Sequence, residues 1–164
     1  MSELAELLER FRRGAELLAV ATTGAAGTEL DFRPASDKWT VREITCHLAD
    51  AEIAAATGLR QILAEENPTL VSWNEKAWTG KLGYEHRKIS QALEMFRLLR
   101  VANYELLKDL PEDTFQRAGV HPQRGRLTLL QRLRDLAEHA EGHVKQIQGV
   151  RAQYKEQRAK QAGR

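Results

Sequence analysis

The fold is decided by residues 125–154, GRLTLLQRLRDLAEHAEGHVKQIQGVRAQY. His143 occupies one position of an apolar seam in this stretch, and His139 lies one helical turn earlier. At 3.6 residues per turn the two side chains are only about 40° apart around a helix, so both imidazoles can reach one interior point. Such a pair often supplies two metal ligands, although solvated histidines at the edge of an amphipathic face are also common. The seam recurs in steps of four and three, as in a long helix packed in a bundle: Leu129, Leu133, Leu136, Ala140, His143, Ile147, Val150 and Tyr154.

The composition of the chain predicts a single domain. Its 164 residues are enough to bury a sizeable core. Lys and Arg number 25 against 23 Asp and Glu, so the net charge near +2 would not by itself attract nucleic acid or an anionic membrane. The basic run KEQRAKQAGR, residues 155–164, is interpreted as a frayed, solvated tail after a domain at residues 1–154.

Cysteine usage and hydropathy bear on the compartment. The single cysteine, Cys46, excludes an internal disulfide and suits a reducing cytoplasm, although a low cysteine count does not exclude export. No apolar run is long enough to span a bilayer, and the N-terminus has no signal-peptide pattern. We therefore expect a cytoplasmic protein with neither a nucleic acid nor a membrane as its partner.

Two earlier segments also have the pattern of amphipathic helices. Residues 2–22 follow helical spacing, and residues 28–38 are predicted to connect across one end of the bundle. The second helix is predicted to begin at Thr40, because Thr40 and Glu43 have the S/T-x-x-E spacing of a capping box. Apolar residues continue at helical spacing from there to about Glu65.

His47 lies on the apolar face of this second helix. Taken alone, it is interpreted as a buried neutral histidine with one hydrogen-bond partner. Cys46 points about 100° away from it around the helix, so it is interpreted as a small core residue and not as a fourth ligand. His86 and His121 have no partner at ligand spacing, and both are interpreted as surface or loop-anchoring residues.

Residues 68–83 form a connection that is long for a helical bundle and carries Trp73 and Trp78 without helical periodicity. The two indoles are predicted either to line a substrate pocket at the end of the bundle or to form a lid that only covers the core. A third helix is predicted from about Tyr84 to Lys108. A second capping box then opens the fourth helix at Thr128.

Four long helices with no alternating strand pattern predict an all-α four-helix bundle. In such a bundle His47 of the second helix can converge with His139 and His143 of the fourth. Three neutral imidazoles with a fourth place left for water are typical of a catalytic zinc site, whereas structural zinc usually has four protein ligands. A divalent metal would acidify that water toward a nucleophile at neutral pH.

Two segments resemble motifs of the DinB/YfiT-like superfamily of metal-dependent enzymes. Residues 38–52, KWTVREITCHLADAE, resemble the family pattern W-[ST]-x-x-E-x-x-x-H-L-x-D-x-E. Residues 121–147, HPQRGRLTLLQRLRDLAEHAEGHVKQI, resemble its HP-x-x-G-x-[LM]-T-L loop and its closing H-x-x-x-H-x-x-x-I helix. The motifs occur in the family's order and extend the resemblance over nearly the whole chain.

The resemblance implies a DinB-like four-helix bundle, often a homodimer, with a divalent metal held by one histidine of the second helix and two of the last. The matching positions here are His47, His139 and His143. Zinc is the expected metal and nickel the alternative. Many relatives carry a further histidine at the position of Gly142 and some carry one at the position of Gln146, and neither departure removes a ligand of the triad. We expect a homodimer.

The resemblance does not decide the reaction. The family includes transferases that join a low-molecular-weight thiol to an electrophile, an isomerase that depends on a small thiol, and many proteins with no known activity. A metal with an open place can bind a sulfur as thiolate or a water molecule for hydrolysis. We expect a small-molecule substrate, with a thiol transferase favoured over a hydrolase by a narrow margin. The alternatives are a metal- or ligand-binding module without catalysis and a structural bundle without metal.

Either reaction needs a group that handles a proton near the metal. Glu43 and Asp50 lie four residues before and three residues after His47, and hence on neighbouring parts of the helix surface. They are predicted to accept an imidazole N–H or to act as general bases. The alternative interpretation for both carboxylates is helix capping and surface charge.

Overall fold

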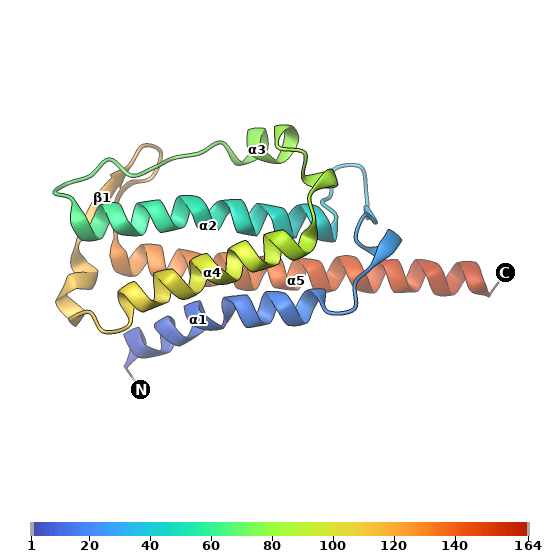
Figure 1. The fold of residues 1–164 in the computed structure, drawn as a ribbon, viewed down its shortest axis with the longest axis horizontal. Helices are drawn as coiled ribbons and strands as arrows, with labels where there is room; N and C mark the ends of the chain where they lie inside the picture. The colour runs from blue at the N-terminus through green and yellow to red at the C-terminus, as the bar shows by residue number, and fades with distance from the viewer. Residues whose placement is uncertain (1, 164) are drawn as a thin grey trace.

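Four long helices form the predicted bundle in the computed structural model, which describes residues 2–163 (Figure 1). A short helix and a two-stranded hairpin lie in the connections between them. The helices are α1 (Glu3–Thr22), α2 (Val41–Ala64), α3 (Glu75–Lys81), α4 (Ile89–Leu107) and α5 (Leu129–Ala162), and the strands are β1 (Ala118–His121) and β2 (Gly125–Thr128).

The order of the helices around the bundle brings α2 beside α5. Both α1 and α2 pack against α4 and α5, so α1 and α2 lie at diagonal corners although they are consecutive in the chain. Figure 1 shows that α1 and α5 run in one direction, and that α2 and α4 run in the other. Residues 65–88 therefore carry the chain back along the bundle before α4 begins, and this crossover lies against α2.

Capping boxes hold the starts of α2 and α5. The Thr40 side chain accepts a hydrogen bond from the Glu43 N–H at 3.1 Å, and the Glu43 carboxylate accepts one from the Thr40 N–H at 2.9 Å. Thr128 and Gln131 make the same reciprocal pair at 3.1 and 2.8 Å. Each pair satisfies two backbone N–H groups that a helix start leaves without partners, and loss of such a cap costs about 1 kcal/mol. Both predicted helix starts are confirmed.

The apolar core has two parts with a buried polar layer between them. One part contains Phe96 of α4 and the other contains Leu107 of the same helix. Arg100 lies between these two positions on α4, is 1% exposed, and pairs with Glu52 of α2. An ion pair buried in this way is tolerated only when each group finds its partners, because removing a charge from water is costly.

Two segments predicted as irregular connections contain secondary structure. α3 lies within residues 68–83, where the Asn74 side chain caps it by accepting a hydrogen bond from the Ala77 N–H at 2.8 Å. β1 and β2 pair in antiparallel fashion, with His121 opposite Gly125. The prediction of a chain without strands is therefore wrong at this hairpin. Both elements are too short to leave a periodic pattern in the sequence.

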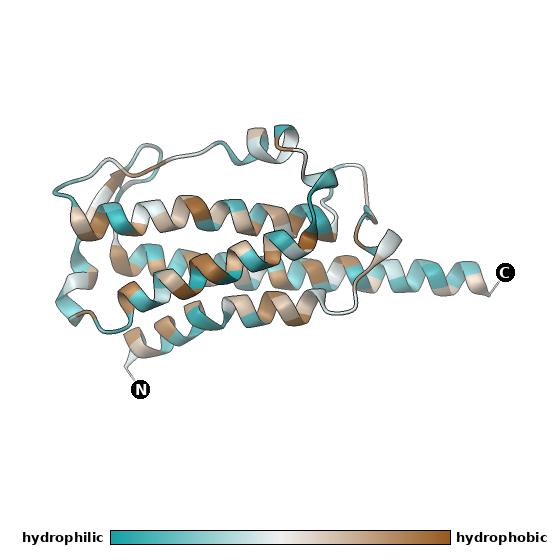
Figure 2. Cartoon of the chain, in the orientation of Figure 1, coloured by the Kyte–Doolittle hydropathy of each residue, from teal (hydrophilic) through white to brown (hydrophobic). Residues whose placement is uncertain are grey.

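The bounds of the last two long helices also differ from the prediction. α4 begins at Ile89 and not near Tyr84, because a short 3₁₀ helix there follows Gly83, whose φ of 62° is left-handed. α5 continues as a helix to Ala162, and so includes residues 155–162 of the segment interpreted as a frayed tail. Figure 2 shows that the part of α5 extending past the other helices is mainly hydrophilic. None of the described helices has both the length and the apolar composition of a membrane span.

Candidate metal centre

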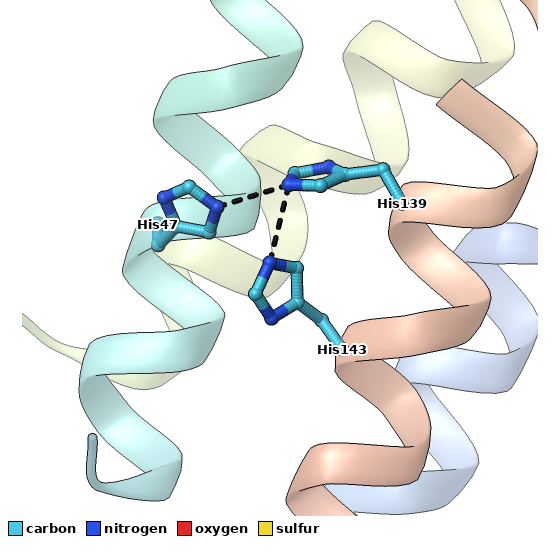
Figure 3. A group of neighbouring side chains, drawn as sticks. All are labelled: His47, His139 and His143. Carbon is cyan, nitrogen blue, oxygen red and sulfur yellow. Dashed lines mark hydrogen bonds between the residues drawn. The ribbon is translucent and has the colours of Figure 1, made fainter. Parts of the chain in front are cut away.

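Three histidines converge between α2 and α5 (Figure 3). His47 comes from α2, whereas His139 and His143 come from successive turns of α5. The Nε2 atom of His139 lies 3.0 Å from Nε2 of His47 and 3.1 Å from Nε2 of His143. His47 is fully buried, and the other two are partly buried. The seams of the two helices thus bring together the three residues that the sequence singles out.

Burial keeps these imidazoles neutral at neutral pH, because the protein interior disfavours the charged form. It lowers the pKa of His47 to about 3, with smaller effects from His143 and His139. It lowers the pKa of His139 to about 4, with smaller effects from His143, Arg100 and Arg132. The pKa of His143 is also lowered, again mainly by burial. Each ring therefore carries one proton and one lone pair.

Hydrogen bonds among the histidines cannot satisfy the cluster. The Nδ1 atom of His143 lies 2.8 Å from Oε1 of Gln146, so Nδ1 carries the proton and Nε2 presents its lone pair to the cluster. Nε2 of His139 faces two nitrogens but can make a well-formed hydrogen bond to only one of them. Nδ1 of His47 is buried and has no hydrogen-bond partner among residues 2–163. A polar cluster left incomplete in this way calls for a further group.

A divalent metal ion fits this donor set. Zinc binds imidazole nitrogen at about 2.0–2.1 Å in tetrahedral geometry, which separates two such nitrogens by about 3.3 Å. The observed Nε2 separations of 3.0 and 3.1 Å need to widen only slightly to reach that spacing. Imidazole ligands suit zinc, nickel and copper, and three protein ligands leave a place open for a small molecule. Cys46 does not take that place, because it is buried facing the Tyr84 carbonyl and burial raises the pKa of its thiol to about 11.

Two tryptophan rings pack directly against the histidine cluster. Trp39, which precedes α2, lies against His47 and His143 with ring centroids 4.8 and 6.0 Å apart. Trp73 of the crossover stacks on His47 at 5.7 Å, and Trp78 of α3 packs against Trp73 at 4.7 Å. The crossover therefore borders the candidate site. Sequence patterns do not assign Trp39 to this site, because the position of the residue before the helix start is already explained by packing at the helix end.

Glu75 supplies a carboxylate at the histidine cluster that sequence reasoning missed. Its Oε1 atom lies 3.6 Å from Nε2 of His47, and its side chain is 54% exposed. Glu75 is the first residue of α3, so the cap provided by Asn74 sets its position. No spacing links Glu75 to the histidines in sequence, and only the folded crossover brings them together.

The two carboxylates predicted to act near the metal have other partners. Glu43 accepts hydrogen bonds from Arg33 at 2.7 Å and from the Thr40 N–H at 2.9 Å. Asp50 accepts them from the Tyr84 hydroxyl at 2.8 Å and from Arg87 at 2.9 and 3.0 Å. Neither belongs to the group of converging ligand atoms found among the described residues. The structure gives Glu43 a capping role and uses Asp50 to hold the segment before α4.

The histidines interpreted as surface or loop-anchoring residues lie outside the cluster. His86 has a side chain that is 85% exposed. His121 anchors the turn of the hairpin, because its Nδ1 accepts a hydrogen bond from the Gln123 N–H at 3.2 Å. His121 also lines a cavity that includes His139 in its wall.

Comparison with known proteins identifies the family. The family described as the DinB superfamily matches residues 8–147. The chain belongs to the DinB superfamily. OB0782 of Oceanobacillus iheyensis, which is named as a candidate metal-dependent hydrolase, is 30% identical over 119 residues that cover 73% of this chain and 69% of the relative. YfiT of Bacillus subtilis carries the same description and is 27% identical over 121 residues, 73% of this chain and 68% of the relative.

The solved structure of YfiT confirms the fold of this DinB-superfamily chain. The two structures superimpose with a TM-score of 0.84 over 92% of this chain and 87% of YfiT, at 24% sequence identity. YfiT is described as having an unusual four-helix bundle topology. These relatives are named as candidate metal-dependent hydrolases, and the described residues of this chain include a three-histidine cluster whose ligand atoms could hold a metal ion.

Proposed function

We propose that this protein is a metal-dependent enzyme in which His47, His139 and His143 bind one divalent ion, zinc or nickel. The observation that carries the proposal is the convergence of three neutral imidazole nitrogens whose own contacts leave the cluster incomplete. A divalent ion there would lower the pKa of a bound water or thiol and so supply a nucleophile for attack on a small electrophile. Gln146 would keep His143 in the tautomer that presents Nε2.

Glu75 is our candidate for the group that handles the proton. A general base needs to lie within reach of the nucleophile's proton, directly or through one water, and Oε1 of Glu75 is 3.6 Å from Nε2 of His47. Half-exposure of this carboxylate also lets it pass the proton to solvent. Trp39 and Trp73 narrow the approach to the histidines, and so would restrict bulk water around the reacting atoms.

Water is the nucleophile that we favour, because the relatives are named as candidate hydrolases. Thiol transfer is the second candidate, since the same three nitrogens and the same carboxylate suit a thiol that must lose its proton. A non-catalytic binding module remains the alternative to both reactions.

Metal content tests the first part of this proposal. The protein is purified without a nickel column, reconstituted with zinc, and analysed for bound metal. We expect about one equivalent, with loss of binding in the variant that has alanine at His47, His139 and His143. His86→Ala is the matched control, because this histidine is exposed and does not belong to the converging ligand atoms. Less than about 0.1 equivalent in the wild type, or unchanged content in the triple variant, would contradict metal binding.

A paired substrate screen tests the reaction. The zinc-loaded protein is assayed with a panel of esters, amides and lactones, and in parallel with monochlorobimane and several small thiols. Hydrolysis that needs no thiol and is lost in His47→Ala would support the favoured reaction, whereas thiol-dependent conjugation with the same sensitivity would support thiol transfer. Bound metal without turnover in either panel would favour the binding module.

A further inference from the structure

A cavity of about 540 Å³ adjoins the histidine cluster. His139 forms part of its wall, so a molecule in the cavity would lie next to the candidate metal centre. α2 contributes only small side chains, Ala51, Ala54 and Ala55, which leave the space open. Polar side chains from α5 and the hairpin also line it: His121, Arg124, Arg132, Asp135 and Glu138.

Arg132 lines this cavity without a hydrogen-bond partner among residues 2–163. Its side chain is only 16% exposed, and its Nε atom is buried and unsatisfied. The nearest carboxylate oxygen, Oδ2 of Asp135, is 4.0 Å from Nη1, which is beyond hydrogen-bond length. A guanidinium is always protonated and has five N–H donors in a rigid fork. Burying such a group without an acceptor is costly, which points to an acceptor supplied by a ligand.

His121 offers a second donor in the same cavity. Its Nδ1 accepts the Gln123 N–H, so the ring proton resides on Nε2. Burial lowers the pKa of His121, and the charges of Arg132 and Arg124 lower it further, which keeps the ring a neutral donor. Nη1 of Arg124 is already bound to Oδ2 of Asp135 at 2.6 Å. Arg132 is therefore the cation of this cavity that donates no hydrogen bond among the described residues, although Oδ2 of Asp135 lies 4.0 Å from its Nη1.

Acidic residues around the cavity limit what this cation can bind. Asp135 is paired with Arg124, Glu138 is exposed, and Glu75 is half-exposed beside the histidines. These carboxylates would repel a polyphosphate, and they leave no strong positive field over the opening. A single carboxylate matches Arg132 better, because its two oxygens can accept two parallel hydrogen bonds from the guanidinium.

We propose that Arg132, with His121 beside it, forms a subsite that binds the carboxylate of a small substrate. The proposal rests on the proposed function in one respect: the electrophilic group of the substrate is expected to lie at the three histidines. Arg132 and His139 are seven residues apart, which is nearly two turns on one face of α5 and about 10 Å along it. The substrate is therefore a short carboxylic acid whose electrophilic carbon lies several bonds from the carboxylate.

Hexanoate and hexanamide test the subsite, since they differ only in the charged group. Each is titrated into the full chain after treatment with a chelator, so that the carboxylate has no metal to bind, and binding is followed by tryptophan fluorescence because Trp73 lines the cavity. We expect hexanoate to bind at least about tenfold more tightly than hexanamide. Arg132→Gln should reduce this preference to less than about twofold. Arg134→Gln should retain it, because Arg134 pairs with Glu3 at the surface.

Three results would overturn the subsite. The first is equal binding of hexanoate and hexanamide to the wild type, and the second is a preference that survives in Arg132→Gln. The third is a fall of more than about 5 °C in the thermal midpoint of Arg132→Gln, because removing a buried cation without partners should not destabilise the fold. Displacement of hexanoate by inorganic phosphate at lower concentration than by acetate would overturn the assignment to a carboxylate.

This test is separate from the test of the proposed function. The titration needs no metal, so carboxylate preference without metal-dependent turnover would retain the subsite and remove the enzymatic proposal. The opposite result is that the protein hydrolyses carboxylate-bearing esters and Arg132→Gln leaves kcat/KM for them unchanged. That result would retain the enzymatic proposal and contradict the subsite.

Discussion

Two buried polar clusters in this bundle have opposite hydrogen-bonding states. In the polar layer of the core, Arg100 donates to both oxygens of Glu52 at 3.0 and 2.7 Å and to the Phe11 carbonyl at 3.0 Å. Asn103 donates to the same carboxylate at 3.0 Å. Phe11 and Phe96 pack on the guanidinium at 4.1 and 4.7 Å. All partners of this cluster come from the protein itself.

The histidine cluster shares α2 with this polar layer and takes its other two residues from α5, yet its contacts leave it incomplete. Nε2 of His139 faces two nitrogens at once, and Nδ1 of His47 has no hydrogen-bond partner in the part of the chain that the structure describes. Buried polar groups that complete one another's hydrogen bonds stabilise a fold. Polar groups that converge but leave hydrogen bonds unmade indicate a place for a ligand. The comparison therefore predicts that the first cluster controls stability and the second controls activity.

The largest expected effect is on activity. His47→Ala removes one of three ligands, and we expect turnover to fall by about 10³-fold or more while the fold is retained. Turnover is measured on the zinc-loaded variant, and its thermal melt shows whether the bundle is intact. A variant that keeps its metal and more than about a tenth of wild-type turnover would contradict the assignment.

Breaking the other cluster should change stability and not activity. Glu52→Gln leaves the buried Arg100 without its carboxylate, and we expect a loss of about 3–5 kcal/mol in the free energy of unfolding, measured in urea. Turnover per folded molecule should stay within about twofold of wild type. The double variant Glu52→Leu with Arg100→Met serves as the control, because replacing both charges by apolar groups should restore most of the loss. A loss below about 1 kcal/mol in Glu52→Gln would mean that the pair is not structural.

Acid should destabilise the metal-free protein as the pH falls from 6.5 toward the folded histidine pKa values of about 4 and about 3. The folded pKa values of about 3 for His47 and about 4 for His139 lie below the ordinary value of 6.5, so the unfolded chain takes up protons that the folded chain does not. Stability is fully present above pH 6.5 and is lost as the pH falls toward these folded values. We expect each histidine to contribute about 1 kcal/mol per pH unit in urea titrations. His47→Ala should flatten the dependence, and an unchanged slope would contradict the shift.

A smaller effect is expected at Gly14, which allows the Arg100 guanidinium to approach α1. A Cβ there would lie 2.8 Å from Nη1 of Arg100, so Gly14→Ala should cost about 1–3 kcal/mol. Gly149→Ala is the matched control within a helix, because a Cβ at that position meets nothing within 4 Å. It should be neutral or stabilise by about 1 kcal/mol, since alanine is the better helix former. If the two variants unfold at the same urea concentration, the prediction is wrong, and Arg100 can move aside for the added methyl group.

Much of this fold could be predicted from the sequence, because it depends on residues within one turn of each other. The capping boxes at Thr40 and Thr128 and the seam of α5 use contacts three or four residues apart. The same local geometry puts His139 and His143 on one face. Glu43 and Asp50 met the same criterion of spacing, but partners from other segments occupy their oxygens.

The sequence by itself determined the helices, the DinB-type motifs and the histidine pair, because helical periodicity and capping act over a few residues. Only the tertiary structure decided what surrounds the pair. The crossover brings Trp73 and Glu75 to His47, and the packing of α2 against α5 opens a cavity beside Arg132. These contacts join residues tens of positions apart, and no local pattern encodes them, because they depend on how the helices pack and on where the connections cross.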